Sequence, residues 1–168
     1  MQNIKLITEK YIVKVLHEED VKEINSLFVK STDYFQKVFD RNPDIRDAST
    51  LFTIVPEGKL PEDKLVLGIY TKNNKLIGLL DLVQNYPEQN AWFLGLLLID
   101  PEERNRKIGT EILLALIKKS EELNITKINV SVGEHNKQAI NFWEKMGFVE
   151  YDKIKKGLKD FIYFTYLL

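Results

Sequence analysis

Two consecutive stretches, "AWFLGLLLID" (residues 91–100) and "PEERNRKIGTEILLALIKK" (residues 101–119), decide the fold. The first is apolar almost throughout, which is typical of a central strand covered on both faces. In the second, five of the six residues before Ile108 are charged, and a strongly apolar helix continues beyond Gly109. A strand that leads through a short loop into a helix begins a strand–helix–strand crossover. We therefore expect this segment at the centre of an α/β sheet.

The start of this helix is unusual because it is positively charged. The helix dipole favours carboxylates in the first turn, yet Arg104, Arg106 and Lys107 precede the helix. The first N–H groups of a helix have no intrahelical partner and can bind an anion. Cations are expected there if the bound group carries several negative charges, as a pyrophosphate does. By itself, the charge run is more typical of a solvated helix start, so the anion site depends on a second motif.

The rest of the chain alternates between strand and helix patterns. Strands are expected at 11–16, 65–71, 76–83 and 125–132, and within "FVEYDKI" and "DFIYFTYLL" near the C-terminus. Helices are expected around 21–28, from the N-cap candidates Ser31 and Thr32, within 44–58, and from Asn136 to Gly147. The pattern predicts a mixed α/β sheet with a hairpin turn at 72–75, in a single domain spanning residues 1–168.

Composition excludes several functional classes. The chain has no cysteine and two histidines, so disulfides, thiolate zinc sites and a cysteine nucleophile are absent, and a histidine-rich metal site is not expected. The net charge of −1 gives no indication of nucleic-acid or membrane binding. The first twenty residues lack a signal-peptide pattern, and no window of about 18 apolar residues predicts a membrane span. We expect a cytoplasmic protein.

The segments "IDPEERNRKIGTEIL" and, further along, "NKQAINFWEKMGF" together resemble the two signature segments of the GNAT family of acyl-CoA-dependent N-acyltransferases. The family loop reads Arg or Gln, two residues, Gly, one residue, then Gly or Ala. Arg104 holds its first place and Gly109 its last. The second segment matches at Asn136, Ala139, Ile140, Glu144, Lys145, Gly147 and Phe148.

This resemblance, which extends from Tyr11 to the C-terminus, implies a mostly antiparallel sheet with splayed central strands and acetyl-CoA bound where they separate. It implies that Leu97, Leu98 and Ile99 hold the pantetheine arm through their backbone groups, and that Asn136 reaches the same arm. A backbone N–H near Leu97 would face the thioester oxygen. The remaining cofactor-binding residues implied are those of the phosphate loop: Arg104, Asn105, Arg106, Lys107, Ile108, Gly109 and Thr110.

The sequence departs from the family pattern in the phosphate loop and at the place of the acid. Lys107 replaces the first glycine of the loop, so it must adopt a negative φ or accept strain there. Trp143 stands where much of the family has a tyrosine that protonates the thiolate. An indole N–H is not a practical acid, and we interpret Trp143 as a packing residue.

A general base is not evident either. Phe93 and Ser131 occupy positions that hold a base in some branches, so the catalytic residues stay unassigned. We expect the rate to depend on the fraction of acceptor amine that is already deprotonated. The alternative is a water relay to Asp81, Glu88 or Glu134.

The family resemblance places the acceptor beside the early helices and the loop before the central strand, which nominates Asp33, Tyr34 and Tyr86. An anionic Asp33 beside aromatic rings would suit a cationic amine, although Tyr34 could equally be part of the core.

The function expected is N-acetyl transfer from acetyl-CoA to a primary amine, small-molecule or peptide, by direct attack in a ternary complex. The alternative is a catalytically silent domain that binds or senses acyl-CoA. A nucleotide-binding domain would require a glycine-rich phosphate loop, which the chain lacks. No metal, nucleic-acid or membrane partner is expected, and a homodimer is left open.

Overall fold

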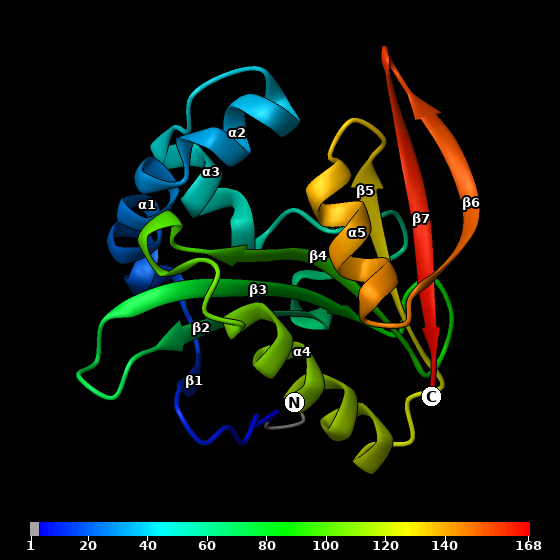
Figure 1. Ribbon diagram of the computed structural model, residues 1–168, viewed down its shortest axis with the longest axis horizontal. Helices are drawn as coiled ribbons and strands as arrows, with labels where there is room; N and C mark the ends of the chain where they lie inside the picture. Colours follow the sequence, from blue (N-terminus) through cyan, green and yellow to red (C-terminus); the bar gives the residue numbers. More distant parts are fainter. Residues whose placement is uncertain (1–3) are drawn as a thin grey trace.

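The computed structural model describes residues 4–168, and its seven strands form one sheet in the order β1-β2-β3-β4-β5-β7-β6 (Figure 1). Neighbouring strands are antiparallel except β4 and β5, which are parallel. The strands are β1 (Ile12–Val15), β2 (Lys64–Tyr70), β3 (Leu76–Gln84), β4 (Ala91–Ile99), β5 (Lys127–Gly133), β6 (Val149–Lys156) and β7 (Lys159–Leu167).

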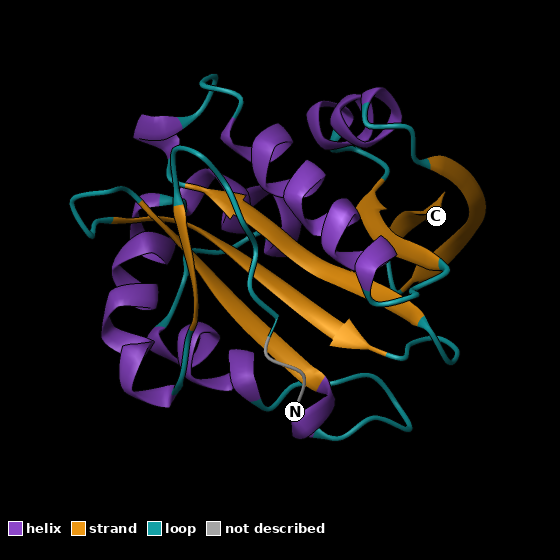
Figure 2. Cartoon of the chain, turned by 90° about the horizontal axis from the view of Figure 1, so that it is seen from below, coloured by secondary structure: helices purple, strands orange, loops and turns teal. Residues whose placement is uncertain are grey.

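Helices lie on both sides of this sheet (Figure 2). The helices are α1 (Val21–Lys30), α2 (Thr32–Phe39), α3 (Ile45–Ser49), α4 (Ile108–Glu122) and α5 (Lys137–Lys145). Buried side chains of α1, α2 and α3 form one core cluster with sheet residues such as Leu79 and Leu98. Those of α4 and α5 form a second cluster with residues such as Leu80 and Leu94. Each face of the sheet therefore has its own core.

The mixed α/β sheet predicted from the sequence is confirmed. The crossover β4–α4–β5 places β4 fourth of the seven strands, as its apolar run indicated. Asn136 caps α5 by accepting a hydrogen bond from the Ala139 N–H at 3.3 Å, and Gly147 follows the helix with φ of 89°. The third early helix is shorter than expected. It ends at Ser49 and continues only as a 3-10 turn over Thr50–Phe52, where the Thr50 hydroxyl donates to the Arg46 carbonyl.

Strand β4 changes its pairing halfway along, and this change creates the site. Asp81 of β3 lies opposite Leu96 and Leu82 lies opposite Leu94, so Gly95 is the extra residue of a β-bulge. Strand β5 pairs with β4 only from Ala91 to Leu94, and the two strands diverge beyond that point (Figure 1). From Gly95 to Ile99, the edge of β4 that faces away from β3 has no strand partner within residues 4–168.

Candidate active site

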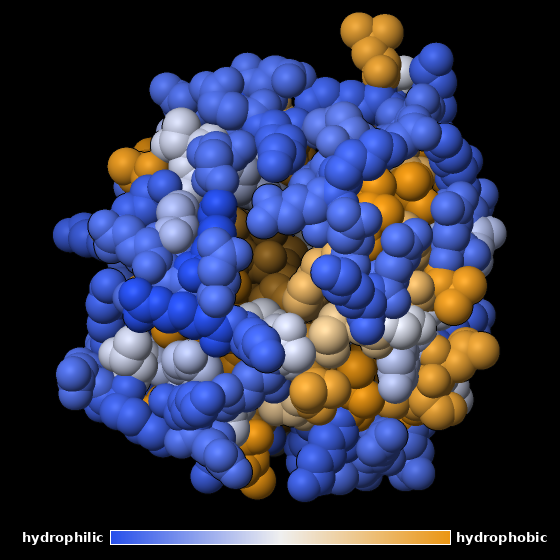
Figure 3. Space-filling model, in the orientation of Figure 1, coloured by the Kyte–Doolittle hydropathy of each residue, from blue (hydrophilic) through white to orange (hydrophobic). Residues whose placement is uncertain are grey.

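A cavity of about 440 Å³ opens beside the free edge of β4. Figure 3 shows a hollow in this part of the molecule, with an apolar floor and a hydrophilic rim. Twelve of the residues proposed from the sequence line the cavity: Asp33, Tyr34, Leu97, Leu98, Ile99, Arg104, Asn105, Lys107, Ile108, Gly109, Thr110 and Asn136. The structure thus brings three separate segments of the chain to one place.

The loop before α4 uses two residues in the left-handed region. Asn105 has a φ of 63° and Lys107 a φ of 61°, so Lys107 takes the strained geometry, not the negative φ. Lys107 lies at the N-cap position, and its side chain forms no cap hydrogen bond with the described part of the chain. Helix geometry leaves the N–H groups of Ile108, Gly109 and Thr110 without intrahelical acceptors. These N–H groups and the nearby lysine form a site suited to a phosphate.

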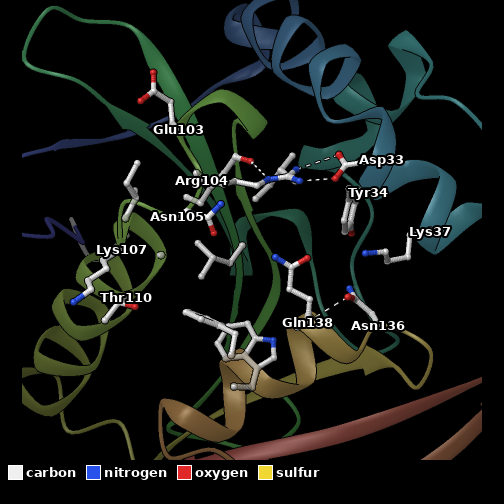
Figure 4. Close-up of a pocket in the computed structure, with 18 residues that line it drawn as sticks. Asp33, Tyr34, Lys37, Glu103, Arg104, Asn105, Lys107, Thr110, Asn136 and Gln138 are labelled. Carbon is white, nitrogen blue, oxygen red and sulfur yellow. Dashed lines mark hydrogen bonds and ion pairs between the residues drawn. The ribbon is translucent and has the colours of Figure 1, made fainter.

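Arg104 and Asp33, expected to face two different ligands, bind each other (Figure 4). The guanidinium of Arg104 contacts both carboxylate oxygens of Asp33 on α2, and its Nε donates to the Ile99 carbonyl at 3.1 Å. The hydrogen bond from Arg104 lowers the pKa of Asp33, against the opposing effect of burial. The pair therefore links α2 to the end of β4 across the cavity mouth.

Two of the proposed residues do not line the cavity. Arg106 forms an ion pair with Glu103 at 2.7 Å, and the Lys75 ammonium contacts the same carboxylate at 3.1 Å. Part of the charge run before α4 is therefore neutralised locally. Tyr86 packs edge-on against Phe93, with ring centroids 5.6 Å apart.

Helix α5 forms the opposite wall of the cavity. A Cβ placed on Gly109 would lie 3.5 Å from the Phe142 ring, which is ordinary contact. Trp143 is only 7% exposed, and its ring packs against Phe142 and Phe148 with centroids 5.1 and 4.9 Å away. Because Trp143 also lines the cavity, it belongs both to the core and to the wall.

The acidic candidates for a general base differ in their surroundings. Glu88 pairs with Lys127 at 2.8 Å, and Glu134 pairs with Lys153, which lowers the pKa of Glu134. Asp81 is mostly buried beside the bulge. Burial raises its pKa to about 6, opposed by the Lys64 ammonium at 3.1 Å.

Sequence reasoning missed several residues of the cavity wall: Lys37, Glu103, Gln138, Ala139 and Phe142. Lys37 lies one helical turn after Asp33, and Phe142 lies one turn after Gln138, so each pair shares a helix face. That spacing could have identified the second member of each pair once the first was assigned to the cavity wall.

Within residues 4–168, no group of three acidic or histidine side chains could hold a metal, and no helix is long and apolar enough to cross a membrane.

Comparisons with known structures agree with this architecture. An acetyltransferase from Thermus thermophilus superposes with a TM-score of 0.74 at 22% identity, over 98% of this chain and 100% of that chain. A probable GNAT-family acetyltransferase from Chromobacterium violaceum gives 0.79 at 17% identity, over 96% and 85%. The PaiA N-acetyltransferase from Thermoplasma acidophilum, in complex with coenzyme A, gives 0.68 at 21% identity, over 94% and 100%. At these identities the likeness shows the fold.

Sequence comparison shows the family. No curated protein matches the chain. The model of the acetyltransferase (GNAT) family matches residues 24–148, a region that contains most of α1 and all of the bulge, the phosphate loop and α5. Family and fold together support acetyl transfer as the general chemistry. The chain belongs to the GNAT acetyltransferase family.

Proposed function

We propose that this protein transfers the acetyl group of acetyl-CoA to a primary amine by direct attack within a ternary complex. The observation that supports this most is the divergence of β4 from β5 after Leu94, which leaves a strand edge free beside the cavity. The free edge begins at the bulge and ends near the start of α4. A long cofactor with amide groups and phosphates fits such a path.

The residues present fit coenzyme A. The backbone of Leu97 to Ile99 would pair with the pantetheine amides, as an added strand does. The N–H groups of Ile108 and Gly109 would hold the pyrophosphate, with Lys107 as the adjacent cation. Asn136 would reach the pantetheine arm. Bound there, the cofactor supplies an activated acyl thioester, and a backbone N–H near Leu97 would stabilise charge on its oxygen.

The acceptor would enter from the side of α2, where Tyr34 faces the cavity (Figure 4). Tyr86 remains a proposed contact further along this side. Asp33 remains one as well, although its carboxylate is shared with Arg104. A small-molecule or peptide amine is the acceptor class that we propose.

Replacement of Gly109 tests cofactor binding directly. A Cβ at this position is tolerated at 3.5 Å from Phe142, so Gly109→Ala should fold and serves as the control. Gly109→Val adds an isopropyl group in the first turn of α4, two methyl groups more than the alanine control has, and should weaken CoA binding at least tenfold in calorimetry. Unchanged affinity in a folded Gly109→Val variant would contradict the phosphate-loop assignment.

A turnover assay distinguishes acetyl transfer from the alternative of a catalytically silent acyl-CoA-binding domain. Wild-type protein incubated with acetyl-CoA and a panel of primary amines should release free thiol. If CoA binds but no amine in the panel is acetylated, the catalytically silent acyl-CoA-binding domain becomes the better description.

A further inference from the structure

We infer that the bulge residue Gly95 and the carboxylate of Asp81 form the binding site for the acceptor's amino group, and that Asp81 receives its proton. This inference rests on the proposed function, because it concerns the amine that the acetyl-transfer reaction needs. It replaces the expectation of a step without a base.

The bulge leaves room for a small cationic group. Gly95 is exposed although it lies within the central strand. A Cβ placed on it would meet the Asp81 carboxylate first, with Oδ2 at 3.3 Å and Cγ at 3.6 Å. Its φ is outside the left-handed region, so the backbone does not require glycine there. A nitrogen that occupies the position of the missing side chain would therefore lie near hydrogen-bond distance of the carboxylate, about 3 Å.

The carboxylate has unused capacity to accept a hydrogen bond. Oδ2 of Asp81 pairs with the Lys64 ammonium at 3.1 Å, whereas Oδ1 is buried without a hydrogen-bond partner among the described residues. Lys64 also donates to the Ile54 carbonyl at 2.7 Å, so its position is fixed from two sides. A carboxylate accepts several hydrogen bonds, and a buried oxygen without one is costly. An ammonium at Gly95 would meet Oδ2 first and share it with Lys64, because a carboxylate oxygen can accept more than one hydrogen bond.

Among the groups around Asp81, Tyr34 connects this site to the cavity. Lys64 faces it from β2 and Tyr34 from α2, while β4 contributes the uncharged residues Gly95 and Leu96. Burial and the charge of Asp81 raise the pKa of Tyr34 to about 12, so its phenol stays protonated as a donor. Because Tyr34 also lines the cavity, the carboxylate lies within electrostatic reach of the cavity wall.

The environment also gives Asp81 a suitable basicity. Burial raises its pKa to about 6, so it is ionised at neutral pH yet holds a proton more readily than an exposed aspartate. Glu88 and Glu134, by contrast, are paired with Lys127 and Lys153 and lie on more exposed segments. Among the carboxylates considered, Asp81 is the one placed at the bulge.

The step balances without another reactant. An N–H bond of the ammonium breaks and its proton goes to Asp81. The freed lone pair forms the N–C bond to the acyl carbon as the C–S bond breaks. The amine's second proton accompanies the departing sulfur as the thiol, and Asp81 then releases its own proton to water.

Gly95→Ala tests the amine site without removing any charge. The added Cβ would take the amine's place, 3.3 Å from Oδ2. With the best acceptor from the amine panel, kcat/KM should fall at least tenfold while the calorimetric Kd for CoA stays within twofold of wild type. Wild-type kcat/KM in Gly95→Ala would overturn the inference, whereas loss of CoA binding in the wild type would instead overturn the proposed function.

Three further variants test the proton transfer. The kcat/KM of the wild type should fall as the pH decreases through about 6, which gives the pH profile an acidic limb. This limb should be absent in folded Asp81→Asn. Lys64 lowers the pKa of Asp81, so Lys64→Met should move the limb to higher pH, an effect that a purely structural ion pair does not predict. Glu134→Gln is the matched control and should leave the limb in place. A limb that follows the acceptor's own pKa, or that stays fixed in Lys64→Met, contradicts the inference.

A readout that does not depend on turnover completes the test. The ¹³C carboxyl resonance of Asp81 should titrate near pH 6 in the CoA-bound protein. Butylammonium should lower the pH of that transition and shift the Gly95 amide resonance, whereas butanol should do neither. If Asp81→Asn does not fold, this titration and Gly95→Ala still decide the outcome. If saturating butylammonium leaves the titration of the Asp81 carboxyl resonance unchanged, the proposed amine site is wrong.

Discussion

The proposed cofactor site and the proposed amine site are built in different ways. At the proposed cofactor site, one continuous segment from Leu97 to Thr110 supplies a strand edge, a loop and a helix start. At the proposed amine site, the residues Tyr34, Lys64, Asp81 and Gly95 come from four separate elements, and of these four only Tyr34 lines the cavity. A site built from one continuous segment can be recognised from a sequence motif. A site assembled from separate strands and helices leaves no such motif.

Two aspartates, Asp33 on α2 and Asp81 on β3, have different surroundings and different pKa shifts. Asp33 lies near the surface beside Arg104, and that hydrogen bond lowers its pKa. Asp81 is buried beside Lys64, and the loss of water raises its pKa despite the lysine. Hydrogen bonding to a cation dominates at the exposed pair, and desolvation dominates at the buried one. The difference suggests a structural link at Asp33 and a proton acceptor at Asp81.

The largest expected effect is on stability at the α5 wall of the cavity, which faces the phosphate loop. Trp143→Ala should lower the free energy of unfolding by about 3–5 kcal/mol, because it leaves a cavity between Phe142 and Phe148. Urea unfolding measures this loss. Trp143→Phe retains an aromatic ring in the same place and should keep most of the acetyltransferase activity.

Tyr86→Ala, on the proposed acceptor side but outside the cavity lining, is the matched comparison. Tyr86 is only partly buried and packs against Phe93, so its truncation should cost less than that of Trp143. Equal losses would show that the two positions are equally packed. A folded Trp143→Phe variant with no activity would show that the indole has a chemical role.

The sequence predicted the sheet and the crossover because these depend on local patterns, and the family resemblance supplied most of the residues that line the cavity. The apolar run of β4 and the cap at Asn136 are examples of such local patterns. It did not predict the pairing of Arg104 with Asp33, since those residues are 71 positions apart and meet only after α2 packs. The bulge at Gly95 was also missed, because register appears only when β3 and β4 are aligned.

A smaller change in the free energy of unfolding is expected for a substitution in the phosphate loop. Lys107 has a φ of 61°, a conformation that glycine adopts without strain. Lys107→Gly should therefore raise the free energy of unfolding by about 0.5–1 kcal/mol, after allowing for the greater flexibility of glycine in the unfolded chain. Arg106→Gly removes the same charge, together with the ion pair to Glu103, at a residue outside the left-handed region, and should not stabilise the protein. Equal effects in the two variants would show that charge, and not backbone conformation, determines the stability of the loop.

The smallest effect concerns the acid stability of the Arg104–Asp33 pair. The folded-state pKa of Asp33 lies below its ordinary value of 3.8, so the pair's contribution is fully present above that pH. It is lost as pH falls through the lowered pKa, because the unfolded chain binds the proton first. Asp33 and Arg104 are 54% and 28% exposed, so solvent screening limits the contribution to under about 1 kcal/mol.

Urea unfolding at pH 6 and pH 3 should show a slightly larger loss of stability for wild type than for Asp33→Asn. Arg104→Gln should behave like Asp33→Asn, because either change removes the pair. If all three proteins lose the same stability between the two pH values, the contact does not hold α2 to the end of β4 in solution.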